Sequence, residues 1–161
     1  MNSSTNKENQ PTMTLTQRWG GLYTVGLMIL LLVFFAYHQW ADTGFFTEKF
    51  IWLSMLALYG PIVISMAPPI LRLIQGRRNP ARLLDAAMDL SLAIGSIWLR
   101  ITFPFDFTHL ADPFPAAMRF AFAWLSNDIG RLILLLQIVI GFLSAFATLA
   151  TYFSIRRKEK G

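Results

Sequence analysis

Residues 132–155 read LILLLQIVIGFLSAFATLATYFSI and contain no charged side chain. A helix of these 24 residues is about 36 Å long, which is enough to cross the hydrocarbon core of a bilayer, roughly 30 Å thick. Two further stretches, 19–41 and 50–71, are also free of charge and contain 23 and 22 residues. The three stretches predict an all-α fold that is embedded in a membrane.

The composition of the whole chain agrees with this prediction. Of its 161 residues, 55% are hydrophobic and only 14% are charged, whereas a soluble domain carries about 25% charged residues. The composition therefore argues against an ordinary water-soluble globule, and it excludes disorder for most of the chain. Cysteine is absent, which excludes thiolate nucleophiles, iron–sulfur ligation and disulfides.

The basic residues give the chain a net charge of +5, and they stand beside the ends of the apolar stretches. Arg72, Arg77 and Arg78 follow the second stretch, and four of the last six residues are basic. Orientation in the membrane and attraction to anionic lipid both explain basic residues in these positions. We therefore expect the lipid bilayer as a partner and no binding of nucleic acid.

A fourth span is expected over residues 83–103, although only residues 90–99 are free of charge. Ten residues of helix reach only about 15 Å, so crossing requires charged side chains inside the helix. At 100° per residue these side chains share one narrow stripe, which can face other helices while the apolar residues meet lipid. The intramembrane polar stripe consists of Arg82, Asp85, Asp89, Ser96 and Arg100.

The intramembrane polar stripe has two interpretations. Ionisable groups inside a bilayer are costly, so a proton or ion relay through Asp89 and Arg100 is one hypothesis. The other hypothesis is a structural clasp in which Arg82 pairs with Asp85 or Asp89. Asp89 lies about 9 Å from the start of the expected helix, and Arg100 lies near its far end, so water or snorkelling can reach both. We favour the clasp.

The expected architecture is a four-helix bundle of transmembrane helices, and the chain is therefore a multi-pass membrane protein. Residues 1–18 form a polar N-terminal tail that we expect to be flexible, and residues 156–161 form a basic tail. A short interfacial helix is expected between the third and fourth spans, because its apolar side chains share one broad side. The expected spans are 19–41, 47–71, 83–103 and 129–155, and the interfacial helix covers 113–125 with Asp112 as its N-cap and Pro113 in its first position.

The distribution of Lys and Arg predicts the orientation. With four spans, both tails and the loop between the second and third spans lie on one side, which carries 10 of the 14 basic residues. Because cytoplasmic segments are enriched in Lys and Arg, both termini are expected to be cytoplasmic. The expected location is a plasma or inner membrane.

The second span contains Pro61, Pro68 and Pro69. Each proline lacks a backbone donor and disfavours a straight helix, although neighbouring helices can satisfy the freed carbonyls. We expect a kink near Pro61 and a break or bend at the two later prolines. Thr47 is the expected N-cap of this span.

The fourth span carries a second stripe, made of small and hydroxylated residues within about 80° of one another on the helix. Helices in lipid use such residues to approach closely. We expect this helix-packing stripe to contact another helix of the chain or of a partner. It consists of Gln137, Gly141, Ser144, Thr148 and Thr151.

Both histidines, His38 and His109, lie on the expected outer side together with several aspartates. His38 and Asp42 would share one helix face, and His109 is three residues from Asp112. Imidazole and carboxylate can bind zinc or act as acid and base, but the spacing matches no known metal or catalytic motif. We therefore expect no metal, no cofactor and no catalytic residue.

These observations favour a non-enzymatic accessory or assembly subunit that acts through helix packing. Its partner is either a second copy, in a homo-oligomer, or another membrane protein. One alternative is a small homo-oligomeric transporter or channel that uses Asp89 and Arg100. A third possibility is a membrane enzyme that works at the outer interface through His109.

Overall fold

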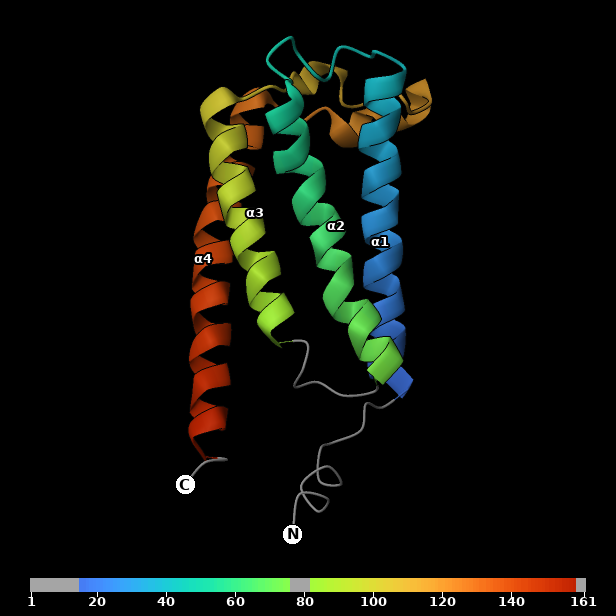
Figure 1. Ribbon diagram of the computed structural model, residues 1–161. Helices are drawn as coiled ribbons and strands as arrows, with labels where there is room; N and C mark the ends of the chain where they lie inside the picture. Colours follow the sequence, from blue (N-terminus) through green and yellow to red (C-terminus); the bar gives the residue numbers. More distant parts are fainter. Residues whose placement is uncertain (1–14, 76–81, 159–161) are drawn as a thin grey trace.

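The computed structural model describes residues 15–75 and 82–158, and this part of the chain is helical apart from one isolated β-bridge. The parts of the expected tails that cover 1–14 and 159–161 lie outside the described residues. The long helices are α1 (Leu15–Trp40), α2 (Trp52–Gln75), α3 (Arg82–Thr102) and α4 (Asn127–Lys158). Two short 3-10 helices, η3 (Phe107–His109) and η4 (Ala116–Phe122), lie between α3 and α4 (Figure 1).

Three of the long helices contain segments that are long and apolar enough to cross a membrane. These segments are Trp19–Trp40 in α1, Trp52–Ile74 in α2 and Asn127–Ser154 in α4. Helix α3 is less apolar, because Asp85, Asp89 and Arg100 lie within it. The chain is therefore all-helical, and its three apolar helices suggest a membrane location.

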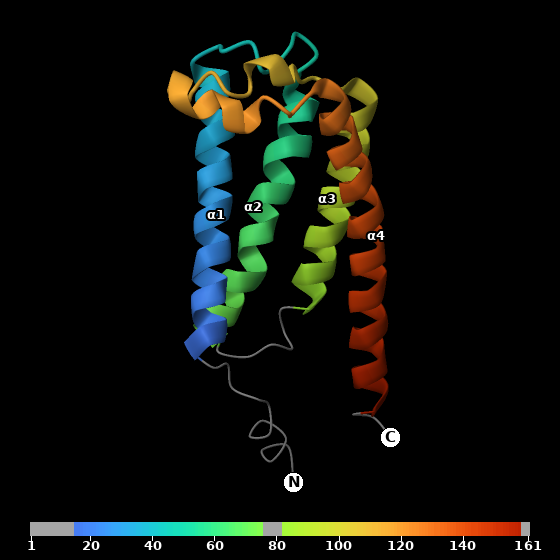
Figure 2. The ribbon, with the colours of Figure 1, turned by 180° about the vertical axis from the view of Figure 1, so that it is seen from behind.

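The four long helices lie in an open row. Close backbone contacts join α1 to α2, α2 to α3 and α3 to α4. Within the ranges 15–75 and 82–158, no such contact joins α1 to α3 or α4, or α2 to α4. Figures 1 and 2 show the row from its two sides, with successive helices running in opposite directions. The expected four-helix bundle is thus not closed by a contact between α1 and α4.

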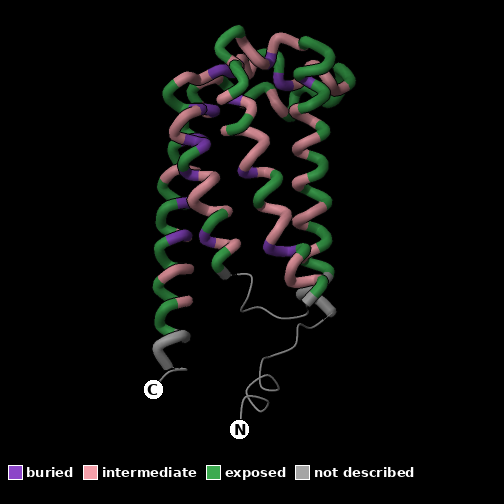
Figure 3. Tube along the Cα trace, viewed as in Figure 1, coloured by how far each residue is buried: buried purple, intermediate pink, exposed green. Residues whose placement is uncertain are grey.

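Side chains on the outward surfaces of the helices are exposed and apolar. Leu30 and Val33 of α1 are 64% and 60% exposed, and Phe146 of α4 is 76% exposed. Figure 3 shows that exposed and half-buried residues alternate down the helices, while buried residues line the helix contacts and gather near the connecting loops. Lipid is a favourable solvent for such surfaces, whereas water is not.

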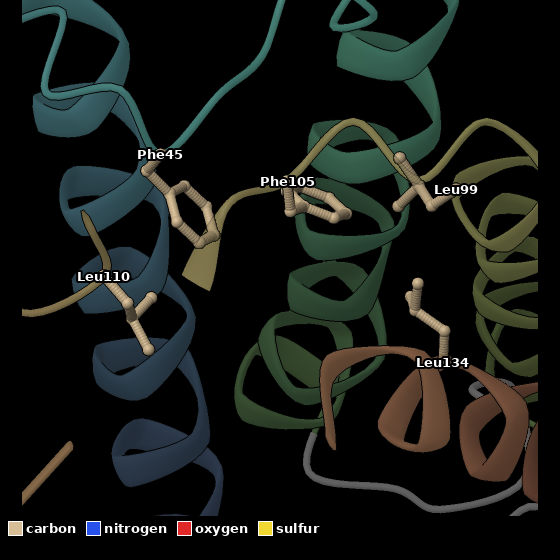
Figure 4. Packing of buried hydrophobic residues seen from close by; sticks show 5 residues of the cluster. All are labelled: Phe45, Leu99, Phe105, Leu110 and Leu134. Carbon is tan, nitrogen blue, oxygen red and sulfur yellow. The ribbon is translucent and has the colours of Figure 1, made fainter. Parts of the chain in front are cut away.

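The buried hydrophobic core lies at one end of the row, in a cap formed by the α1–α2 loop (41–51) and the α3–α4 segment (103–126). Its central residues come from the cap and from α3 and α4, and Figure 4 shows how their side chains converge. Many phenylalanine rings surround them, such as the stacked pair Phe46 and Phe50 with ring centroids 3.9 Å apart. The central residues are Phe45, Leu99, Phe105, Leu110 and Leu134.

Main-chain hydrogen bonds join the two segments of the cap. Phe46 and Phe105 form the isolated β-bridge. The N–H of Thr47 donates to the carbonyl of Pro104 at 3.0 Å, and the N–H of Asp106 donates to the carbonyl of Phe45 at 2.7 Å. The loop between α1 and α2 is therefore fixed to the segment that follows α3.

Helix α2 differs from its expected form at both ends. It begins at Trp52, and Thr47 does not serve as its N-cap, because the Thr47 hydroxyl has no hydrogen-bond partner among the described residues. It also continues through Pro61, Pro68 and Pro69 to Gln75. This described helix has no break at the later prolines, contrary to expectation. Pro68 and Pro69 are both buried, so neighbouring helices shield these two residues.

Candidate functional site

The contact between α3 and α4 brings the two sequence-predicted stripes together. The hydroxyl of Ser96 donates to Gln137 Oε1 at 3.1 Å. At Gly141 a Cβ atom would lie 2.8 Å from the carbonyl oxygen of Asp89, so α4 approaches the backbone of α3 closely there. Arg100 Nη1 donates to the carbonyl oxygen of Arg131 at 3.2 Å. Residues from both stripes thus form an internal contact of the chain.

The remaining members of the helix-packing stripe lie further along α4. Ser144 and Thr148 are half-buried, whereas Thr151 is exposed. The Thr151 hydroxyl donates to the carbonyl of Ala147 at 2.8 Å, within its own helix. The stripe is therefore used against α3 at Gln137 and Gly141 and becomes accessible towards the end of α4.

Two polar contacts hold α2 against α3. Arg72 forms an ion pair and hydrogen bond with Asp85, and both side chains are largely shielded. The sequence assigned this role to Arg82, whose side chain lies outside the described residues. Towards the other end of the contact, Trp98 Nε1 donates to the hydroxyl of Ser54 at 3.2 Å. The side chain of Asp89 is half-buried, and its carbonyl faces Gly141 of α4.

A proline and a glycine bring the backbones of α2 and α3 together. Pro61 has no N–H, so it leaves the carbonyl of Ala57, four residues earlier, without its helical partner. This carbonyl oxygen lies directly against Gly95 of α3, where a Cβ atom would overlap it. Only glycine permits this approach, and the contact explains how α2 remains continuous through Pro61.

An apolar groove with a volume of about 410 Å³ lies along the surface between α2 and α3. Sequence reasoning missed this groove, although the small residues Gly60 and Gly95 were a visible signal. The groove has few polar lining residues. One of them, Ser91, donates its hydroxyl to the carbonyl of Met88 at 2.8 Å. The groove is lined by Leu53, Leu56, Ala57, Gly60, Pro61, Ile64, Ser91, Ile94, Gly95 and Trp98.

His38 lies at the end of α1 beneath the cap and is only 1% exposed. Its Nδ1 atom is 2.5 Å from the hydroxyl of Thr43. The centroids of the Phe34 and Phe45 rings lie 4.7 and 4.8 Å from the centroid of the imidazole ring. Among the described residues, Nε2 has no hydrogen-bond partner. Asp42 does not share a helix face with His38 as expected, because α1 ends at Trp40 and Asp42 has a φ of 46°.

His109 and Asp112 form an exposed pair on the cap, with 2.9 Å between Nδ1 and Oδ2. Asp106 has a different role, because its carboxylate accepts hydrogen bonds from the hydroxyl and main-chain N–H of Thr108. These bonds lower the pKa of the Asp106 carboxyl from its usual value of 3.8. In the part of the chain that is described, no three potential ligand residues are grouped so that they could hold a metal ion.

The segment expected to form an interfacial helix over 113–125 contains the shorter helix η4, which begins after Pro115. Arg119 donates to the carbonyls of Phe114 and Asp112, at 3.1 and 3.3 Å. These bonds hold η4 against the residues that precede it. The rings of Phe114 and Phe122 stack with 4.6 Å between centroids. Figure 2 shows η4 lying across the ends of the helices near the top of α1.

The fold and contacts define a class of protein, an all-helical chain with three apolar helices that are long enough to cross a membrane. In comparisons with family models, curated proteins and solved structures, no match to this chain is found.

Proposed function

We propose that this chain is a small four-span membrane protein that serves as a non-enzymatic accessory or assembly subunit. The observation that carries the proposal is the open row of helices, in which α1 contacts only α2 among the long helices, and α4 contacts only α3, across the described residues. A row of this kind leaves one apolar helix at each edge with most of its surface free for a second copy or for another membrane protein.

The cap supports the crossing of α3. Because the α1–α2 loop is hydrogen-bonded to the segment after α3, both lie on the same side of the membrane. If α2 carries the chain away from that side, α3 must carry it back. Helix α3 also lies between α2 and α4, so it shares their depth, and two of its charged side chains have polar partners in these helices.

The orientation follows from charge and from the position of the helix ends. The first turn of α1 and the last turn of α4 lie at the same end of the row, opposite the cap (Figure 1). The helix ends opposite the cap carry basic residues, namely Arg18, Arg72, Arg82, Arg156, Arg157 and Lys158. This excess supports cytoplasmic termini and an outer cap in a plasma or inner membrane.

The exposed aromatic residues of the cap support a position at the membrane interface. Phe120 and Trp124 of the η4 region are 78% and 63% exposed, and Trp40 and Trp52, at the adjoining ends of α1 and α2, are 85% and 71% exposed. Tryptophan is enriched at the level of the lipid headgroups, because its ring is apolar and its N–H is polar. We infer that η4 and these tryptophans lie at the outer headgroup level.

The edge formed by α4 is the surface that we propose for subunit contact. Leu143 and Phe146 are 66% and 76% exposed there, on the same helix that bears the accessible end of the helix-packing stripe. Replacement of both residues by alanine is expected to lower the oligomer fraction or to release a co-purified partner. Native mass spectrometry after extraction in a mild detergent measures this change.

The matched control is Val63→Ala, because Val63 is also exposed, at 55%, but lies on α2 within the row. This control is expected to leave the assembly unchanged. A monomeric wild-type protein with measurable ion flux that Asp89→Asn abolishes would contradict the proposal and favour a transporter or channel.

A further inference from the structure

We propose that the groove between α2 and α3 is a binding site for one acyl chain of a membrane lipid. The inference rests on the membrane arrangement proposed above, because both helices must lie at bilayer depth. Three properties of the groove point to this occupant: its chemistry, its length and its width.

The chemistry of the lining excludes polar ligands. The lining is almost wholly apolar, and its two polar side chains already have hydrogen-bond partners. Trp98 Nε1 donates to Ser54, and the Ser91 hydroxyl donates to the carbonyl of Met88. A polar molecule in the groove would lose its hydrogen bonds to water and gain none, which is costly. A hydrocarbon segment has no hydrogen bonds to water that it could lose when it enters the groove.

The length of the groove matches one leaflet of a bilayer. On α2 the lining runs from Leu53 to Ile64, a distance of about 16 Å along the helix axis. Leu53 follows Trp52, the first residue of α2 at the cap end, so the groove begins near the expected interface. Half of a hydrocarbon core is about 15 Å thick. The groove therefore extends from the headgroup level to the middle of the bilayer, as an acyl chain does.

The width of the groove suits a single chain. Its floor is formed by small residues, and the contact between Ala57 and Gly95 fixes the distance between the two helices. Leu56 and Ile94 line the groove and are 60% and 61% exposed, so they form its rims. A helix of a second copy is about 10 Å wide with its side chains and would rest on these rims. A hydrocarbon chain can reach the floor.

Trp98 provides the readout, because its indole ring lines the groove. In a variant that retains only this tryptophan, with Trp19, Trp40, Trp52 and Trp124 replaced by phenylalanine, bromine on lipid chains quenches its fluorescence by contact. The variant is reconstituted in phosphatidylcholine vesicles that contain increasing fractions of lipid brominated at mid-chain. We expect Trp98 to be quenched more strongly than a tryptophan introduced at Ile140, an exposed position on α4 without a groove.

Two variants change the groove while Trp98 itself is retained. Gly60→Leu adds a side chain where only Leu56 lies within 4 Å of a Cβ atom, and Ile94→Ala removes one rim. Both are expected to abolish the excess quenching of Trp98. Ile101→Ala is the matched control for the second variant, since Ile101 is 75% exposed on the same helix but does not line the groove, and it should retain the excess.

The outcomes separate this inference from the membrane arrangement on which it rests. Loss of the excess quenching in both groove variants supports the acyl-chain site. Quenching of Trp98 no stronger than at position 140, or unchanged in both groove variants, overturns the site and leaves the four-span arrangement intact. Protection of Trp98 from brominated lipid by a cross-linked second copy also overturns the site. Quenching of Trp98 by aqueous iodide overturns the arrangement and the site together.

Discussion

Gly95 is the residue at which α3 meets the Ala57 carbonyl of α2, and its hydrogen atom takes the place where any other residue has a Cβ atom. The neighbouring group is backbone, which cannot rotate away as a flexible side chain can. The two helices can therefore pack this closely only if residue 95 is glycine.

The first prediction concerns this glycine. Gly95→Ala is expected to lower the free energy of unfolding by about 1–3 kcal/mol, the usual cost of overpacking. Thermal unfolding in detergent measures the change. Gly26→Ala is the control, because nothing lies within 4 Å of a Cβ atom at position 26 of α1. Equal stability of the two variants would show that α2 and α3 do not approach closely at Gly95.

Asp106 makes the cap sensitive to acid. The hydroxyl and N–H of Thr108 stabilise its ionised form and lower the pKa of its carboxyl. The resulting stability is fully present above the unfolded-state value of 3.8 and is lost as the pH falls through the lower folded-state pKa.

The second prediction follows from this linkage. Thermal unfolding of the wild type should show a loss of stability below about pH 4, and Asp106→Asn should reduce that loss while lowering stability at neutral pH. The amide chemical shift of Thr108 reports the same titration locally. Asp128→Asn is the control, because the Asp128 side chain is 90% exposed; an identical effect of the two variants would contradict the role of Asp106.

At the scale of elements, the ion pair between Arg72 and Asp85 ties the pair α1–α2 to the pair α3–α4 at the end away from the cap. Asp85→Asn is expected to lower stability by about 1–3 kcal/mol, between the values for surface and buried pairs, because it leaves Arg72 half-buried without its partner. Arg72→Gln combined with Asp85→Asn should recover part of this loss. Strict additivity of the two single changes, measured by unfolding, would show that the residues do not interact.

Much of the element structure is predictable from the sequence. The absence of charge over 19–41, 50–71 and 132–155 predicts the three apolar helices, because length and polarity alone decide whether a helix suits a bilayer. The angular positions of Ser96 and Gln137 place each residue on an inward stripe. Neither stripe indicates that its partner is the other one, because periodicity within a helix carries no information on its neighbours.

The parts that sequence reasoning missed depend on contacts between distant segments. Thr47 has the chemistry of an N-cap, but its hydroxyl has no hydrogen-bond partner among the described residues. Its N–H is bonded to Pro104, and α2 begins later. Pro61 leaves the Ala57 carbonyl without a helical partner, and this carbonyl lies against Gly95 of the next helix. The pairing of Asp85 with Arg72 joins two helices, and the spacing of residues within α3 alone does not predict it. Each of these contacts joins segments that are distant in the sequence, so a local pattern does not predict it.

The whole molecule offers a direct test of topology, because the chain contains no cysteine. Single cysteines can replace the exposed residues Glu48 and Thr108 and, in the basic tail, Gly161. A membrane-impermeant maleimide is expected to label the first two in intact cells and the third only after permeabilisation. This result follows from the cap, which fixes the two loops to one side, and from the excess of basic residues at the other end. Labelling of positions 48 and 108 from opposite sides would exclude a crossing by α3.

The β-bridge between Phe46 and Phe105 also has a consequence for biosynthesis. A ribosome adds about 5–20 residues per second. Phe105 lies 59 residues after Phe46 in the sequence, so it is made several seconds later. In the proposed four-span arrangement, the hairpin of α1 and α2 enters the bilayer during this interval, before the residues that shield Phe45 and Phe46 have been made. Nascent chains arrested before residue 105 should therefore be captured by insertion factors or degraded, and release should coincide with translation of the segment that contains Phe105.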